Sequence, residues 1–155
     1  MPAAESSPPG EAEQAAPESR APDGAELIAA FLEHSPFVRH LGIRLELIEP
    51  DRAVLAMPFA EPLVTIGDVV HGGAISSLID TAAMTAAWST AQIPEQPRGT
   101  TVGLTVHFLA PARSRALAAD ARVIRRGSSL CFCEVDVADG GGNPVAKGLV
   151  TYKLG

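Results

Sequence analysis

The hydrophobic and polar positions along this chain follow two different periods. From His71 to Trp88, apolar side chains recur every three or four residues, which is the period of an α-helix. They cover most of the circumference, and after two opening glycines no helix breaker occurs before Pro94, so we expect one long helix that is buried on several sides. A shorter amphipathic helix is predicted around residues 27–32, ending before Pro36.

Elsewhere the pattern alternates every second residue or forms short apolar runs between turn residues, which is typical of β-strands. The predicted strands comprise residues 43–47, 54–58, 101–108, 117–124, 130–137 and 145–152. The predicted connections are a loop at 61–70, a turn at 125–128 and a hairpin loop at 139–143. Because runs of strands flank a single long helix, we predict an α+β fold with an antiparallel sheet of about six strands around that helix.

The amino-terminal segment differs in composition from the rest of the chain. Residues 1–24 are rich in Pro, Ala, Glu, Ser and Gly, so we expect a disordered tail followed by one domain at 25–155. A net charge of −6 argues against a nucleic-acid-binding surface. The chain has no apolar run of about 18 residues and no basic segment followed by an apolar one at its start, so we expect no membrane span and a cytoplasmic location.

Cys131 and Cys133 are the two cysteines of the chain. They lie two residues apart on a predicted strand, so their side chains share one face, which is a poor geometry for a mutual disulfide. Free thiols also fit a reducing compartment. We expect no metal site here, for want of a further Cys or His ligand near them in the sequence.

One charged side chain, Asp80, lies within the long predicted helix. A carboxylate on a buried helix is unfavourable unless it is paired or used for chemistry. At the start of the same helix, Gly72 and Gly73 present backbone N–H groups that lack partners within the helix, and the helix dipole favours negative charge there. The segment therefore offers a donor for an oxyanion at its start and a carboxylate about two turns later.

Each of these features also has a purely structural explanation. Paired glycines can simply make a tight turn, and a histidine such as His71 is often a satisfied group at a loop–helix junction. Ser76, Ser77 or Thr81 lies close enough in the helix to donate a hydrogen bond to Asp80. The occurrence of all these features in one short segment favours a functional site.

The motif His71-Gly72-Gly73 followed by Leu78-Ile79-Asp80 resembles the signature of the hot-dog-fold acyl-CoA thioesterases of the phenylacetate-degradation type, in the hydroxybenzoyl-CoA thioesterase superfamily. The resemblance extends over residues 37–152 and implies a sheet wrapped around a central helix. It also implies hydrolysis of an acyl-CoA to the free acid and CoA. In that reaction the N–H of Gly72 or Gly73 stabilises the oxyanion, and Asp80 acts as a general base or as a nucleophile. CoA is part of the substrate, and no cofactor is expected.

The same resemblance implies roles for further residues. Thr101 matches the Ser or Thr that orients the water, although an ordinary strand threonine is an equal alternative, and His71 shapes the thioester pocket. Thr65 stands six residues before His71, where family members commonly carry an asparagine, and is a weaker donor. The remaining predicted substrate or CoA contacts are Gly73, Val102, Gly103, Arg125, Arg126, Gly127 and Ser128. The two arginines suit CoA phosphates, but they can equally be solvated charges at a turn.

The distance along the helix predicts that two chains share the active site. Asp80 lies about 10–12 Å from Gly72 and Gly73 along the axis, whereas reacting groups must approach to about 3–3.5 Å. Two antiparallel helices related by a two-fold axis place Asp80 of one chain beside Gly72 of the other. We therefore expect a homodimer with two sites, and the resemblance implies that such dimers can pair again into tetramers.

Two other functions remain open at this point. The replacement of asparagine by Thr65 is compatible with a non-catalytic acyl-CoA-binding protein. An acyl-thioester dehydratase of the same fold is the third hypothesis, although such enzymes usually carry a different His–Asp arrangement. The acyl group is equally open among phenylacetyl, hydroxybenzoyl and medium-chain groups.

Overall fold

A computed structural model describes residues 23–90 and 92–155 of the chain. The predicted tail therefore lies outside the described residues, except for Asp23 and Gly24 at its end. The elements in chain order are α1 (Gly24–His34), α2 (Pro36–His40), β1 (Arg44–Glu49), β2 (Arg52–Met57), a 3₁₀ turn (Glu61–Leu63), β3 (Val64–Ile66), β4 (Val69–Val70), α3 (Gly72–Trp88), β5 (Gly99–Phe108), β6 (Leu117–Arg126), β7 (Leu130–Asp139) and β8 (Pro144–Leu154).

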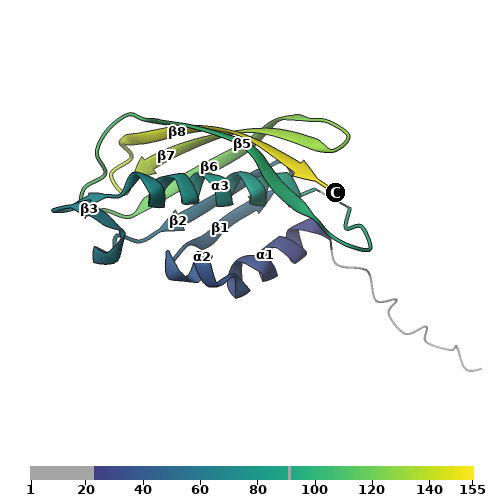
Figure 1. Ribbon diagram of the computed structural model, residues 1–155, viewed down its shortest axis with the longest axis horizontal. Coiled ribbons are helices and arrows are strands. Elements are labelled where there is room, and N and C mark those ends of the chain that lie inside the picture. The colour runs from purple at the N-terminus through teal and green to yellow at the C-terminus, as the bar shows by residue number, and fades with distance from the viewer. Residues whose placement is uncertain (1–22, 91) are drawn as a thin grey trace, which may run out of the picture.

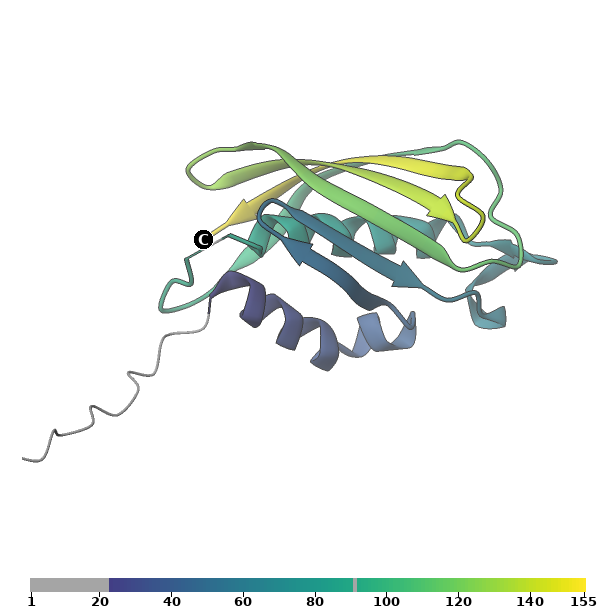
Figure 2. The same ribbon diagram turned by 180° about the vertical axis from the view of Figure 1, so that it is seen from behind.

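Six of these strands form one antiparallel sheet in the order β1-β2-β6-β7-β8-β5. The sheet curves around α3, and α1 lies on the same side of the sheet as α3 (Figures 1 and 2). This arrangement confirms the predicted α+β hot-dog fold. No helix within residues 23–90 and 92–155 is both long and apolar enough to span a membrane.

The central helix is buried because small and branched apolar residues face the sheet. Leu78 and Ile79 have no exposed area, and four alanines of α3 are equally buried, which lets the helix approach the strands closely. Gly148 of β8 lies directly against Ile79, so a side chain at position 148 would overlap it. α3 contacts β2, β6, β7 and β8, and the core lies between this helix and the inner face of the sheet.

The structure differs from the sequence-based expectation at three connections. Residues 61–70, expected to be a loop, form a 3₁₀ turn and the short β3–β4 hairpin, whose strands are too short to show a period. Pro36 begins α2 directly after α1, as proline can at a first helical position. Arg125 and Arg126 lie in β6 and not in the following turn, because a bulge between Val123 and Arg125 lets the strand continue.

The two cysteines lie on β7 with their side chains buried against the helix side of the sheet, and both are free thiols. This confirms that they share a face. Burial raises the pKa of Cys133 to about 12, and burial also raises the pKa of Cys131. Both sulfurs are therefore protonated at neutral pH and act as small apolar core groups.

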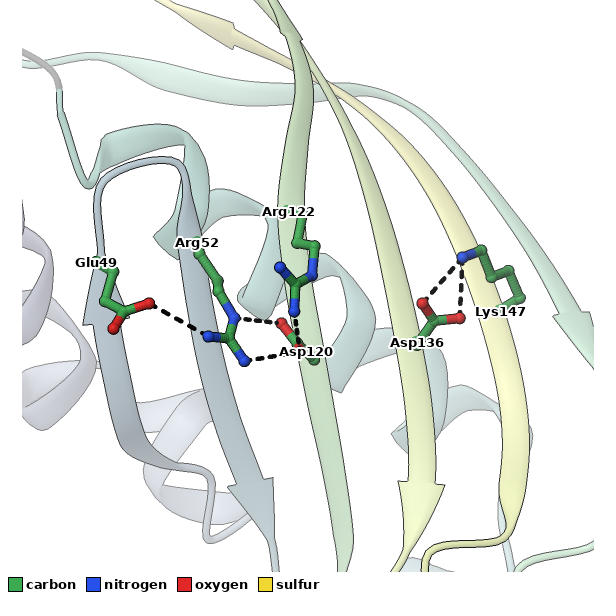
Figure 3. A network of polar contacts seen from close by, with 6 residues as sticks. All are labelled: Glu49, Arg52, Asp120, Arg122, Asp136 and Lys147. Carbon is green, nitrogen blue, oxygen red and sulfur yellow. Dashed lines mark hydrogen bonds and ion pairs between the residues drawn. The ribbon is translucent and has the colours of Figure 1, made fainter.

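The outer face of the sheet carries ion pairs across neighbouring strands (Figure 3). Arg52 of β2 makes two parallel hydrogen bonds of 3.0 Å to Asp120 of β6, and Arg122 contacts the same carboxylate at 3.0 Å. Lys147 of β8 lies 2.9 Å from Asp136 of β7. Because Ala119 and Ala121 point into the core, the alternation of the strand directs Asp120 outward.

Candidate functional site

The start of α3 is capped by the side chain of His71. Its Nδ1 accepts a hydrogen bond of 2.8 Å from the backbone N–H of Gly73, which places the proton of the neutral ring on Nε2. The N–H groups of Ala74 and Ile75 donate to the carbonyl of His71. Among the described residues, the N–H of Gly72 has no acceptor, so it is the donor that the helix start leaves for a ligand.

Gly72 lies against the aromatic ring of Phe108, the last residue of β5. A Cβ at position 72 would come within 3.1 Å of the Phe108 ring. The two residues line a pocket of about 360 Å³, and Thr65 of β3 lines it as well. The structure therefore brings Thr65 and Gly72 together, as the motif comparison predicts, and adds Phe108.

Asp80 lies in the middle of α3, half-buried, and it is held from a neighbouring strand. The hydroxyl of Thr101 in β5 donates a hydrogen bond of 2.6 Å to Oδ1 of Asp80. In contrast, the hydroxyls of Ser76, Ser77 and Thr81 donate to backbone carbonyls one turn earlier in their own helix. The structural alternative, in which helix hydroxyls satisfy Asp80, is therefore not what the structure shows.

The second oxygen of Asp80 is not engaged by the protein groups that the structure describes. Among the described residues, Oδ2 has no hydrogen-bond donor and no cation pairs with the carboxylate. This oxygen is thus open to a water or substrate, while Oδ1 fixes the orientation of the group. An oriented carboxylate with one free oxygen suits a general base or a nucleophile.

Tyr152 lies near Asp80, and Trp88 at the carboxyl-terminal end of α3 contacts Tyr152. Tyr152 of β8 is the cross-strand partner of Thr101, and its hydroxyl accepts a hydrogen bond of 3.2 Å from Nε1 of Trp88. Burial raises the pKa of Tyr152, and the negative charge of Asp80 adds to this effect. The phenol is therefore neutral. The sequence analysis did not select Tyr152 or Trp88 as site residues. The one signal available in the sequence was that each is the sole residue of its type in the chain.

The predicted CoA contacts differ in their freedom to bind phosphate. Arg126 donates to the carboxylate of Asp51 through Nε at 3.0 Å and through a second nitrogen at 2.5 Å. Arg125 is exposed and, within residues 23–90 and 92–155, has no ion-pair partner. Gly127 and Ser128 are exposed in the β6–β7 turn. Of the two arginines, Arg125 is the one available to a phosphate.

Val102 and Gly103, the other predicted contacts, lie next to Thr101 on β5. Both are exposed, and Val102 occupies a bulge at which the pairing of β5 with β8 shifts by one residue. They lie on the edge strand of the sheet, because β5 pairs only with β8 in the strand order. Their position leaves them open to a ligand or to another chain.

Within one chain the predicted residues form three separate groups. Thr65, Gly72 and Gly73 lie at the start of α3, and Asp80 with Thr101 lies near its middle. Gly72 and Asp80 are eight positions apart in the helix, which corresponds to about 12 Å along its axis. The third group lies at the β6–β7 turn. Among the residues that the structure describes, no three His, Cys, Asp or Glu side chains gather closely enough to hold a metal ion.

Comparisons with known proteins agree on one family. Residues 67–146 match the sequence profile of the family described as the thioesterase superfamily, a segment that contains α3 and β5 to β7. A Halobacterium salinarum protein with a proposed esterase activity is 33% identical over 86% of this chain and 94% of its own length. The Escherichia coli medium/long-chain acyl-CoA thioesterase YigI is 29% identical over 81% of this chain and 89% of its own length.

Solved structures show the same fold. A thioesterase family protein from Silicibacter pomeroyi superposes with a TM-score of 0.78 and 27% identity, covering 84% of this chain and 97% of that one. The Escherichia coli PaaI protein from the phenylacetic acid degradation operon has a TM-score of 0.73 at 22% identity, covering 84% of this chain and 92% of that one. The second similarity concerns the fold alone.

Proposed function

This chain belongs to the thioesterase superfamily and is a thioester hydrolase, and from that premise we propose that it hydrolyses an acyl-CoA to the free acid and CoA. The observation that supports Asp80 as the reacting carboxylate is its hydrogen bond of 2.6 Å from Thr101. This contact orients one oxygen and leaves the other open, and among the described residues no cation pairs with the carboxylate.

In the proposed reaction the carbonyl oxygen of the thioester accepts a hydrogen bond from the N–H of Gly72. The helix dipole and this donor stabilise the negative charge that develops there. In the general-base route, water attacks the carbonyl carbon, Oδ2 of Asp80 takes the proton, and the C–S bond then breaks to release CoA thiolate. In the nucleophilic route, Oδ2 attacks the carbonyl carbon and the C–S bond breaks, which releases CoA thiolate and leaves a mixed anhydride on Asp80; water then hydrolyses this anhydride to the free acid and regenerates the carboxylate. Incorporation of ¹⁸O from labelled water into Asp80 during turnover is expected for the second route alone.

The uncovered face of α3 supports the proposal that two chains share this site. The residues of α3 that are not buried are Gly72, Gly73, Ser76, Ser77, Asp80 and Met84. They form one stripe that begins at the helix start and passes through Asp80. A second chain with its α3 antiparallel would place its Gly72 beside this Asp80.

The exposed edge of the sheet lies beside the same stripe. Leu104 and Phe108 of β5 are 41% and 55% exposed, and their cross-strand partners Val150 and Ala146 are buried in the core. Both side chains therefore lie on the helix side of an unpaired edge strand. An edge of this length with exposed apolar side chains is a typical pairing surface, which supports a homodimer. Pairing of two dimers into a tetramer stays a prediction.

The reaction is tested by incubating the protein with a panel of acyl-CoA thioesters and a thiol-detecting reagent. The panel contains phenylacetyl-CoA, a hydroxybenzoyl-CoA and straight-chain acyl-CoAs. Release of free CoA from at least one of them is the expected result. Tight binding of acyl-CoA without thiol release would instead indicate a binding protein, and a change in the acyl double bonds without thiol release would indicate a dehydratase.

The shared site is tested by complementation between two inactive variants. Asp80→Asn removes the base, and Gly72→Ala brings a methyl group against Phe108 and the donor N–H. Co-refolded in equal amounts, half of the dimers should be mixed and each should contain one intact site, so about a quarter of the wild-type activity should return. Mixed dimers that form without any recovery would contradict a shared site.

The role of Arg125 in holding CoA is tested by comparing two substrates. Arg125→Ala should raise KM for acyl-CoA about three- to tenfold and leave KM for the corresponding acyl-pantetheine nearly unchanged, because the latter lacks the nucleotide phosphates. Arg126→Ala is the matched control, since its ion pair with Asp51 gives it a structural role and its effect should fall on stability. Equal effects of Arg125→Ala on both substrates would contradict phosphate binding.

A further inference from the structure

A second pocket lies between α1, α3 and the start of β5, on the carboxyl-terminal side of Asp80. Its volume is about 540 Å³, larger than that of the pocket at Gly72. Its apolar and aromatic lining comprises Leu27, Ile28 and Phe31 of α1, Met84 and Trp88 of α3, and Tyr152 of β8, and residues 97–99, which include the exposed Arg98, complete it. Figure 1 shows α1 and α3 on the same side of the sheet. A concave and mainly apolar pocket of this size is typical of a ligand site.

The pocket adjoins the proposed reacting group. Met84 follows Asp80 by four residues, so the two side chains lie on the same face of α3 about 6 Å apart along the axis. Tyr152 is the cross-strand partner of Thr101, the residue that holds Asp80. For a substrate whose thioester carbonyl lies beside Asp80, the pocket therefore begins about one helical turn away.

In the buried wall of the pocket, the polar side-chain atoms of Trp88 and Tyr152 already satisfy each other, whereas Arg98 lies exposed at the rim and donates to Gln96 at 3.0 Å. Nε1 of Trp88 donates its hydrogen bond to the hydroxyl of Tyr152, at 3.2 Å, and both side chains are at most 5% exposed. A hydroxyl carried into this part of the pocket by a ligand would lose water without gaining a free partner, which is unfavourable. An unsubstituted hydrocarbon has no hydrogen bonds to lose there, and the removal of its apolar surface from water favours binding.

From these observations we propose that the pocket holds the acyl part of the substrate and selects unsubstituted straight-chain acyl groups, with Met84 and Phe31 setting the accepted length. The proposal rests on the thioesterase function proposed above. Met84 lies where the pocket meets Asp80, and its half-buried, unbranched side chain can adjust to a chain. Phe31 is 48% exposed at the α1 wall, where it can cover apolar atoms of the ligand.

The kinetic test compares kcat/KM for straight-chain acyl-CoAs from acetyl to myristoyl. For the wild type, kcat/KM should rise about fourfold per added methylene until the pocket is full and should then level off. Met84→Phe, which fills the pocket, should lower the ratio of kcat/KM for decanoyl-CoA to that for acetyl-CoA by at least about tenfold. Met84→Ala should shift the preferred acyl-chain length upward. Phe31→Ala should shift it downward.

Phe37→Ala is the matched control, because Phe37 is a comparably exposed phenylalanine, 57%, on α2 and does not line the pocket. Its length preference should equal that of the wild type. An unchanged decanoyl-to-acetyl ratio in the Met84 and Phe31 variants would overturn the proposal, as would a wild type that prefers hydroxybenzoyl-CoA to decanoyl-CoA.

A binding measurement separates this proposal from the reaction itself. Trp88 is the only tryptophan of the chain and lines the pocket, so its fluorescence reports occupancy. Decanoate should change the emission in a saturable way, and acetate should not; Met84→Phe should weaken the decanoate effect. A saturable decanoate signal without hydrolysis of any acyl-CoA would contradict the proposed function and would still support acyl binding in the pocket. Hydrolysis without any decanoate signal would overturn the pocket and retain the function.

Discussion

Asp80 and Asp120 are partly buried carboxylates on opposite sides of the same sheet, and their partners differ. On the outer face, Asp120 is contacted by two arginines, and the hydrogen bonds from Arg52 hold the pKa of its carboxyl below the usual range against the opposing effect of burial. On the helix side, Asp80 has one neutral hydroxyl as a donor, from Thr101. The carboxylate of Asp120 is thus engaged by cations in a structural cluster, whereas that of Asp80 is oriented by a neutral hydroxyl and keeps one oxygen without a partner among the described residues.

This comparison distinguishes carboxylates that form ion pairs from a carboxylate that is available for the reaction. Three surface pairs or clusters repeat the pattern of Asp120: Lys147 bridges Glu134 and Asp136, Asp68 pairs with Arg113, and Asp51 pairs with Arg126. Exposed pairs of this kind contribute little to stability individually. Asp80 does not belong to such a pair in the part of the chain that the structure describes, and for this reason it is the carboxylate that we assign to the reaction.

The largest expected effect is that of Asp80→Asn, which keeps the shape and removes the proton acceptor. Turnover of acyl-CoA should fall by about two orders of magnitude or more, as is typical for loss of a general base. The melting temperature should stay close to that of the wild type, because Thr101 can still donate to the amide oxygen. Asp120→Asn, measured in parallel, should retain wild-type turnover. A folded Asp80→Asn protein with nearly normal turnover would contradict the assignment.

An intermediate effect is expected for Thr101→Val, which has the same shape and lacks the hydroxyl. The loss of the bond that orients Asp80 should lower kcat about tenfold and leave KM nearly unchanged, since Thr101 acts on the reacting group and not on binding. Thr101→Ser should restore most of the activity because it restores the donor. A Thr101→Val enzyme with normal kcat would show that the contact is a structural one.

The smallest effect is expected for Asp120→Asn and concerns stability. It should lower the melting temperature by about 2–4 °C at neutral pH. Because the folded-state pKa of Asp120 is lowered, its contribution is fully present above the unfolded-state value of about 4 and is lost as the pH falls through the folded-state pKa. The difference between wild type and variant, measured by denaturant unfolding, should therefore shrink as the pH falls below about 4. A difference that grows in acid would contradict this account.

Several positions show how far the sequence could predict the site. The motif comparison identified Gly72, Asp80 and Thr101 as candidates, and the structure places Thr101 in contact with Asp80, whereas the resemblance implied only that Thr101 orients the water. It named Gly72 as the expected oxyanion donor, although both glycine N–H groups at the helix start qualified. The cap formed by His71 uses the N–H of Gly73 and so distinguishes the two, but this depends on a side-chain conformation that no sequence pattern encodes.

The sequence by itself determined the helix and strand periods, the lone carboxylate on α3 and the glycines at its start. These properties depend on neighbours within one or two turns, so a linear pattern contains them. Only the tertiary structure decided that Arg126 is held by Asp51, that Phe108 lies against Gly72 and that Trp88 meets Tyr152. Each of these pairs joins residues at least 36 positions apart, and their contact depends on sheet order and strand register, which local periodicity does not specify.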